Sequence, residues 1–147
     1  MKLTITEAPA SLSRVKTATR PALRVALVQT RWHQDQAEHE SVLMNGISQA
    51  AQAGAKIVFL QELTLSRYPA DVKPEGVPSK IAEKLQGGKT HLFAAKAAKE
   101  HGVVIHASLY EQAELADGRG LNTAILVNTD GEIIARTPKL HIPVTAG

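Results

Sequence analysis

Residues 56–63 read KIVFLQEL, and this stretch decides the fold class. The run from Lys56 to Leu60 is short and is apolar after its first residue. Such a run predicts a strand that is buried in the middle of a sheet. Gln61 and Glu62 then return the chain to polar surroundings. In open α/β sheets, ligands bind beyond the carboxyl ends of the strands, so these two residues mark the first place to look for chemistry.

A second buried strand and a helix precede this stretch. The run LRVALVQT at residues 23–30 is again short and almost wholly apolar. Asp35 can cap a helix, with Glu38 three residues later as its capping-box partner, and Gly54 can end it. One face of that helix is apolar or small, as a buried helix face requires: it carries Leu43, Ile47, Ala50, Ala51 and Gly54.

The rest of the chain predicts more helices and strands. A Pro-rich loop spans residues 66–80, a short helix spans Lys80–Gln86, and a clearer helix spans Thr90–His101 before Gly102. Three strand-like runs follow, and the last two flank Asp130-Gly131, a strong hairpin signal. Strands that alternate with helices predict an α/β fold with a parallel start, joined by an antiparallel hairpin. The three runs are residues 103–111, 121–128 and 132–137.

The composition narrows the classes of function. The 147 residues suit one domain, and the absence of cysteine excludes disulfides and a cysteine nucleophile within this sequence. Residues 1–24 carry five basic residues and one acidic residue, a net +4 that leaves the remainder at −1. That distribution argues against nucleic acid as a partner, and no apolar run approaches the roughly 20 residues of a membrane helix. We interpret residues 1–22 as a flexible basic tail; an organelle transit peptide is the alternative.

Charged side chains follow three of the predicted strands. Glu62, Glu111 and Lys139 each stand just beyond an apolar run. If they converge, two carboxylates beside an ammonium can shift each other's pKa values and serve acid–base chemistry. The simpler interpretation is that strand ends carry charges because they return to solvent. An unrelated flavodoxin-like binding domain is a further alternative, although no phosphate-binding loop supports it.

Several strings together resemble the nitrilase superfamily, the carbon–nitrogen hydrolases. IVFLQEL, then SLYE with LNTAILVNTDGEI after it, and finally PKLHIP occur in the order seen in that family. The resemblance covers residues 23–147 and implies the first half of a four-layer α-β-β-α sandwich. Half of such a sandwich would leave an apolar sheet face uncovered. The family usually has Arg before its lysine, whereas this sequence has Pro138.

The resemblance also implies roles for individual residues. Glu62 matches the general base, Lys139 the lysine that stabilises the tetrahedral intermediate, and Glu111 a second glutamate that orients the lysine and substrate. His141 and Tyr68 are expected to contact substrate. The family's cysteine nucleophile would lie downstream of Lys139, and this sequence ends eight residues after it. We therefore expect that the chain alone forms no acyl-enzyme.

The resemblance further implies a substrate class and a setting. Gln61 before the base, SLYE and KLHIP favour the branch of N-carbamoylputrescine amidases and β-ureidopropionases. The expectation is an amidohydrolase for non-peptide C–N bonds, acting on a linear amide or N-carbamoyl amine. No metal or cofactor is expected, and the full-length form is expected to be a cytoplasmic homo-oligomer. The alternative is a truncated inactive product, or a non-catalytic subunit that binds through its open sheet face.

Overall fold

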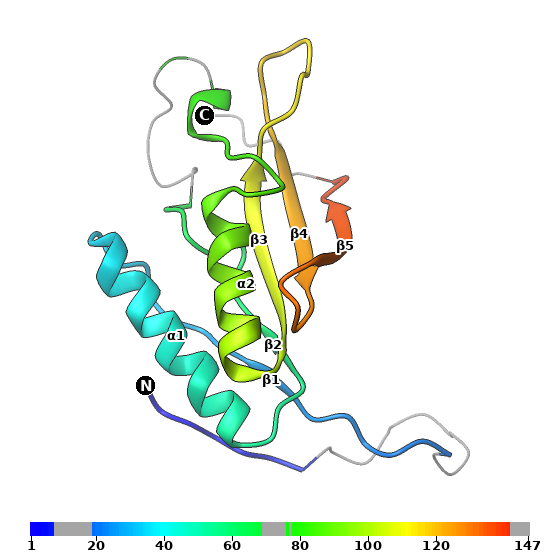
Figure 1. Ribbon diagram of the computed structural model, residues 1–147. Coiled ribbons are helices and arrows are strands. Elements are labelled where there is room, and N and C mark those ends of the chain that lie inside the picture. The colour runs from blue at the N-terminus through cyan, green and yellow to red at the C-terminus, as the bar shows by residue number, and fades with distance from the viewer. Residues whose placement is uncertain (8–18, 69–75, 77, 142–147) are drawn as a thin grey trace.

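The computed structural model describes residues 1–7, 19–68, 76 and 78–141. Residues 8–18 of the expected tail, part of the loop before residue 80 and the end of the PKLHIP motif lie outside the described residues. Figure 1 shows the elements in chain order. They are β1 (Val25–Leu27), α1 (Gln36–Gln52), β2 (Ile57–Phe59), the 3₁₀ helix η2 (Pro78–Ile81), α2 (Lys89–His101), β3 (Val104–Glu111), β4 (Leu121–Val127) and β5 (Ile133–Pro138).

The strands form one mixed sheet in the order β1-β2-β3-β4-β5. The pairs β1–β2 and β2–β3 are parallel, while β3–β4 and β4–β5 are antiparallel. The parallel start and the antiparallel hairpin are therefore confirmed. Gly131 closes that hairpin with φ +80°, in the left-handed region that suits glycine. The helix expected over Lys80–Gln86 is wrong, because Glu83 instead forms a bridge to Glu111 beside β3.

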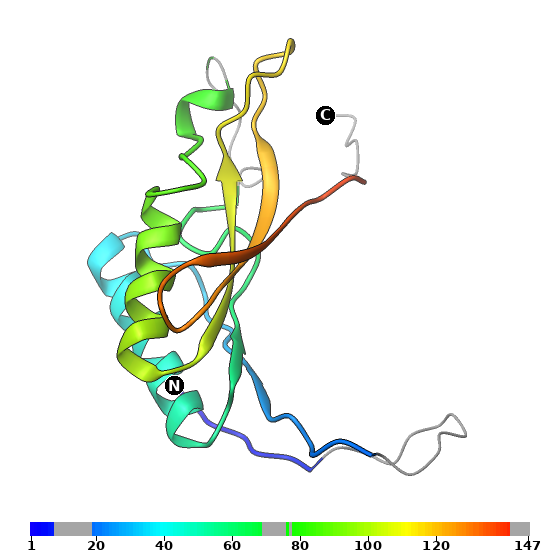
Figure 2. The same cartoon turned by 45° about the vertical axis from the view of Figure 1, so that its right-hand side comes forward.

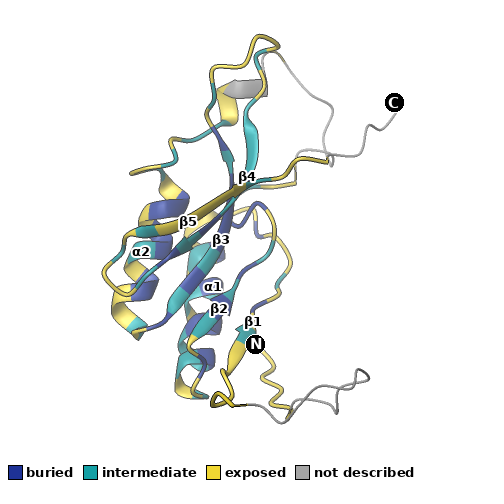
Figure 3. Cartoon of the chain, turned by 90° about the vertical axis from the view of Figure 1, so that its right-hand side faces the viewer, coloured by how far each residue is buried: buried dark blue, intermediate teal, exposed yellow. Residues whose placement is uncertain are grey.

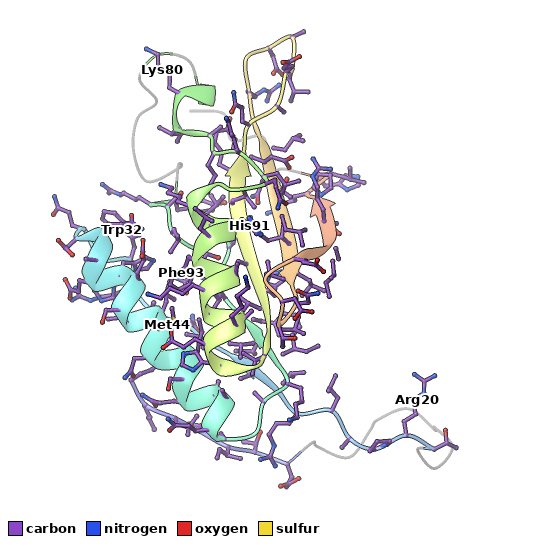
Figure 4. The ribbon with its side chains drawn as sticks, in the orientation of Figure 1. Arg20, Trp32, Met44, Lys80, His91 and Phe93 are labelled. Atoms are coloured by element: carbon purple, nitrogen blue, oxygen red, sulfur yellow. The ribbon has the colours of Figure 1, made fainter. Side chains whose placement is uncertain are left out.

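Both helices cover the same face of the sheet, as Figures 1 and 2 show from two directions. The sequence places apolar residues at alternate positions of β3 and β4, so that every second side chain meets the helices. Met44 of α1 and Phe93 of α2 lie in the space between the two helices (Figure 4). The fully buried centre of this core is made of Leu43, Ile47, Val58, Ala94, Ala97, Ala98, Ile105, Ala107 and Val127.

The ends of the helices follow the sequence signals. The Asp35 side chain accepts a hydrogen bond of 2.7 Å from the Glu38 backbone N–H, which caps α1. At the other end, Gly54 has φ +87°, its N–H bonds to Ala51, and the Ala55 N–H bonds back to Ala50. This pair of bonds is a Schellman motif, which requires a left-handed residue at the position of Gly54. The predicted start and stop of α1 are confirmed.

The opposite face of the sheet carries no helix within the described residues (Figure 3). Leu27 and Ile134, on strands at the two edges, are 82% and 56% exposed. This arrangement is what the sequence leads us to expect of one layer of helices on one sheet. Within the described residues, no helix is both long enough and apolar enough to cross a membrane.

Candidate active site

Three side chains meet at one end of the strands, just beyond the carboxyl end of β2. Lys139 Nζ lies 2.9 Å from Glu62 Oε1, and Asn122 Nδ2 donates to the same oxygen at 2.7 Å. The side chains of Glu62 and Lys139 are 40% and 41% exposed, so water or a bound molecule can reach them. Two of the three expected strand-end charges are thus brought together, across 77 residues of sequence.

The topology of the sheet explains why these residues meet. β5 is antiparallel to β4, and β4 is antiparallel to β3, so β2, β3 and β5 all run in the same direction. The carboxyl ends of these three strands therefore lie at the same end of the sheet, which is also where β4 begins. The Lys139 N–H donates to the Asn122 carbonyl at 2.7 Å, which extends the β4–β5 ladder by one residue. Pro138 sits on an edge strand, where the loss of a backbone donor is tolerated.

The ion pair shifts the pKa values of both charged groups. Lys139, and then Asn122, lower the pKa of Glu62 by hydrogen bonding to its carboxylate; partial desolvation opposes this effect only in part. The same hydrogen bond and the charge of Glu62 raise the pKa of Lys139. The pair is therefore ionised at neutral pH, with a carboxylate that can accept a proton and an ammonium that can stabilise negative charge.

The turn that carries Glu62 has an unusual backbone. Leu63 has φ +51°, the left-handed region, which a branched side chain seldom adopts. Contacts with β3 hold it there: the Leu63 N–H donates to Ser108 Oγ at 3.2 Å, and the Thr64 N–H donates to the Ser108 carbonyl at 2.9 Å. Such a conformation costs on the order of 1–3 kcal/mol and persists only where the surroundings determine it. The neighbours of Glu62 are thus tightly fixed.

Glu111, the second expected glutamate, has other partners. Its carboxylate binds the Arg136 guanidinium through both oxygens at 2.8–3.1 Å and accepts 2.6 Å from Thr123 Oγ1. Asn122 and Thr123 are successive residues of β4, so their side chains point to opposite faces of the sheet. Glu62 therefore lies on the open face and Glu111 on the helix-covered face. The structure does not bring Glu111 to the lysine, and this is a correction to the expected cluster.

The two expected substrate contacts occupy different positions. Tyr68 is 45% exposed, on the segment that follows the turn of Glu62. His141 is exposed at the end of the described chain, two residues beyond Lys139. Among the described residues, no group of three His, Cys, Asp or Glu side chains is placed to hold a metal ion.

Asn122 is the residue of this site that the sequence reasoning missed. It opens an apolar strand, where an asparagine looks like the end of the preceding loop. Its Oδ1 lies 3.4 Å from Ser108 Oγ, which helps turn its amide N–H toward Glu62. The available signal was a polar amide within the otherwise largely apolar run LNTAILV.

Comparisons with known proteins agree with this geometry. A family model described as carbon-nitrogen hydrolase matches residues 24–147. The human omega-amidase NIT2 and a citrullinase from Francisella tularensis are 31% and 29% identical over 122 residues, which is 82% of this chain and 41% of each relative. The solved carbon–nitrogen hydrolase from Helicobacter pylori G27 is 26% identical, with a TM-score of 0.67 over 80% of this chain and 40% of its own.

These matches confirm the expected fold and show how much of the relatives' length this chain spans. The α/β architecture, with its mixed sheet, is shared with the Helicobacter protein. The chain spans about two-fifths of the length of the relatives it matches. Because the family model covers nearly all residues from the first strand onward, the chain belongs to the carbon–nitrogen hydrolase family.

Proposed function

We propose that this chain supplies the glutamate base and the lysine of an amidohydrolase site that cleaves a linear amide or an N-carbamoyl amine. The observation that carries the proposal is the contact between Glu62 and Lys139 on the open face of the sheet. A carboxylate and an ammonium 2.9 Å apart, both partly exposed, can serve a proton transfer and a developing oxyanion at the same carbonyl carbon.

The remaining group in the proposed reaction is a thiol. The sequence contains no cysteine, so the thiol would come from outside these 147 residues. Glu62 would take the thiol proton while sulfur attacks the carbonyl carbon, and Lys139 would stabilise the resulting oxyanion. The amine would then leave with the proton held on Glu62. Water would release the acyl or carbamoyl group from sulfur, again with Glu62 as base.

The pKa of Glu62 bears on this role. Lys139 and Asn122 lower that pKa, which makes the carboxylate a weaker base than an isolated one. Covering the open face with apolar surface would desolvate the carboxylate and raise its pKa. We therefore infer that the base reaches its working strength when the open face is covered. Glu111 has no direct part in this proposal, because Arg136 and Thr123 hold its carboxylate on the other face.

The substrate class is inferred from the sequence and from the named relatives. Gln61 before the base and the KLHIP string favour N-carbamoyl amines, whereas the relatives include both an omega-amidase and a citrullinase. Citrulline itself carries a carbamoylated amine. We propose that Tyr68 and His141 contact such a substrate. We also propose that residues 23–147 are the N-terminal portion of the hydrolase domain, behind a flexible basic tail at residues 1–22, and that the full-length form is a cytoplasmic homo-oligomer.

The test measures ammonia release from amides and N-carbamoyl amines. The protein is isolated from its source, both as wild type and as variants made in the source's own gene. Glu62→Gln and Lys139→Ala should each lower kcat by at least about a hundredfold while the protein stays folded. Glu114→Gln and Lys96→Ala are matched changes of exposed charge elsewhere and should leave kcat unchanged. Wild-type turnover in either site variant would refute the role assignment.

A non-catalytic binding subunit is the second candidate, and the lack of cysteine favours it. In that case exposed apolar side chains of the two edge strands, such as Leu27 and Ile134, would contact a partner protein. Intact mass of the protein from its source separates the two candidates. A species of 15.7 kDa with no hydrolase activity would support the subunit. A longer, active, cysteine-containing species would support the enzyme.

A further inference from the structure

We propose that His39 of α1 is a positioning residue for Glu62, acting through its hydrogen bond to the backbone of the turn that carries this glutamate. The inference deepens the proposed function, because it rests on Glu62 being the group that must be aimed. It concerns a buried pair of histidines, His33 and His39, which lies in the helix layer and makes no contact with Lys139 or Asn122 in the described structure.

The first step of the argument is the anchor at Thr64. This residue is fully buried, and four hydrogen bonds tie it to its surroundings. Its N–H and Oγ1 contact the backbone of Ser108, and Oγ1 also donates 2.9 Å to the Gln61 carbonyl on the near side of Glu62. Its carbonyl accepts 2.9 Å from His39 Nε2. Glu62 therefore sits between two fixed points, and α1 holds one of them.

The second step is the backbone strain at Leu63. A leucine with φ +51° relaxes unless neighbouring contacts oppose the relaxation. β3 supplies contacts to the N–H groups of Leu63 and Thr64, and His39 supplies the contact to the Thr64 carbonyl. Without the last, the peptide after Thr64 loses its anchor in the helix layer, and less opposes the relaxation of the strained residue. Glu62, which precedes that residue, would then turn away from Asn122 and Lys139.

The third step is the tautomer of His39. A carbonyl oxygen only accepts, so His39 Nε2 must carry the hydrogen. In the neutral ring Nδ1 is then an acceptor, and it lies 3.2 Å from His33 Nδ1, which must donate. The rings also pack, with centroids 5.5 Å apart. His33 thus donates to the ring nitrogen that the bond to Thr64 leaves as an acceptor, so both contacts favour the same tautomer of His39.

The test uses the pKa of the Glu62 carboxyl group, followed by carbon-detected NMR on the 147-residue chain. That pKa is low because Lys139 and Asn122 contact the carboxylate, so it reports whether Glu62 is in place. His39→Gln and His39→Asn form a matched pair of amides. The glutamine nitrogen falls near the position of Nε2 and can reach Thr64, whereas the asparagine nitrogen falls near Nδ1 and cannot.

The expected result is a wild-type pKa of Glu62 in His39→Gln and a pKa raised toward the ordinary value in His39→Asn. Amide exchange of Leu63 and Thr64 should accelerate about tenfold in His39→Asn. Leu43→Ala, one turn further along α1 and fully buried, is the control for a loss of packing alone. It should lower global stability and leave the pKa of Glu62 unchanged.

An unchanged Glu62 pKa in folded His39→Asn would overturn the proposal, and so would an equal shift in Leu43→Ala. Should His39→Asn fail to fold, His39→Phe gives the same test, because it keeps a ring in the buried position and removes the donor to the Thr64 carbonyl. A wild-type Glu62 pKa in His39→Phe would then refute the proposal. The readout needs no substrate, so a lack of hydrolase activity would count against the proposed function and not against this inference.

Discussion

Breaking the ion pair between Glu111 and Arg136 should lower the free energy of unfolding much more than breaking an exposed ion pair of the same length. Replacing Arg136 by alanine leaves the Glu111 carboxylate, only 9% exposed, without its bidentate partner. Removing one member of a fully buried pair costs about 3–5 kcal/mol. Arg136 is 37% exposed, so water can enter in its place, and Thr123 still donates 2.6 Å to the carboxylate. We therefore expect a loss of about 2 kcal/mol in the free energy of unfolding.

The chain offers a matched control for this change. Arg119 and Asp117 form an ion pair of 2.7 Å, against 2.8 Å for Arg136 and Glu111, but their side chains are 68% and 47% exposed. Arg119→Ala should cost less than about 0.5 kcal/mol, as exposed pairs do. Urea unfolding at pH 7 measures both variants, and the larger loss corresponds to a midpoint lower by roughly 1 M.

Two outcomes would refute this reasoning. Equal losses in Arg119→Ala and Arg136→Ala would mean that burial of the carboxylate does not determine the cost. A loss in Arg136→Ala that persists in full when Glu111 is also changed to Gln would mean that the stranded charge is not its cause. The double variant should recover part of the stability, because a neutral amide is easier to bury than a carboxylate.

Four further predictions concern other contacts. Asp35→Ala removes the cap of α1 and should cost about 1 kcal/mol in thermal unfolding, whereas Asp35→Asn should cost little. Gly54→Ala should also cost about 1 kcal/mol, from φ alone, because the new Cβ would meet nothing nearer than 3.8 Å; no loss would contradict the Schellman assignment. Asn122→Ala should raise the pKa of Glu62. Because that pKa is lowered in the fold, the ion pair stabilises the protein above the ordinary pKa of glutamate and ceases to do so as the pH falls through the lowered value. Because the pKa of Lys139 is raised, the contribution is lost only as the pH rises through that raised value. A stability difference between wild type and Glu62→Gln that persists at both extremes of pH would contradict this.

The sheet and its order were accessible from sequence because their signals are local. KIVFL marks a central strand, Gly54 and Gly102 end the two helices, and Asp130-Gly131 closes the hairpin. Each signal reflects a constraint within a few residues, such as a left-handed backbone or a buried apolar run. The convergence of Glu62 and Lys139 also followed in part, because strand direction places both residues at the same end of the sheet.

The expected place of Glu111 failed because strand ends were considered without the faces of the sheet. Glu111 lies an even number of residues from Ile105, Ala107 and Leu109 along β3, and side chains at such positions point to the same face of the sheet. Those three apolar side chains point toward the helices. The alternation of side chains along the strand would therefore have placed Glu111 on the helix-covered face. The turn at Leu63 could not have been found in this way, because its conformation is imposed by Ser108, 45 residues away.

The two ends of the β4–β5 hairpin contact different parts of the protein. At its closed end, buried His91 of α2 donates 3.1 Å to the Gly131 carbonyl and so moors the turn to the helix layer (Figure 4). At its open end, Asn122 and Lys139 face each other as the two partners of Glu62. Fraying of the open end would withdraw Lys139 from Glu62, whereas Asn122 would stay in place, because β4 is also paired with β3 at Tyr110. Glu62 would then lose its charged partner and keep its amide partner, so the end of the chain at β5 controls the charge beside the carboxylate, while the middle of the sheet controls its orientation.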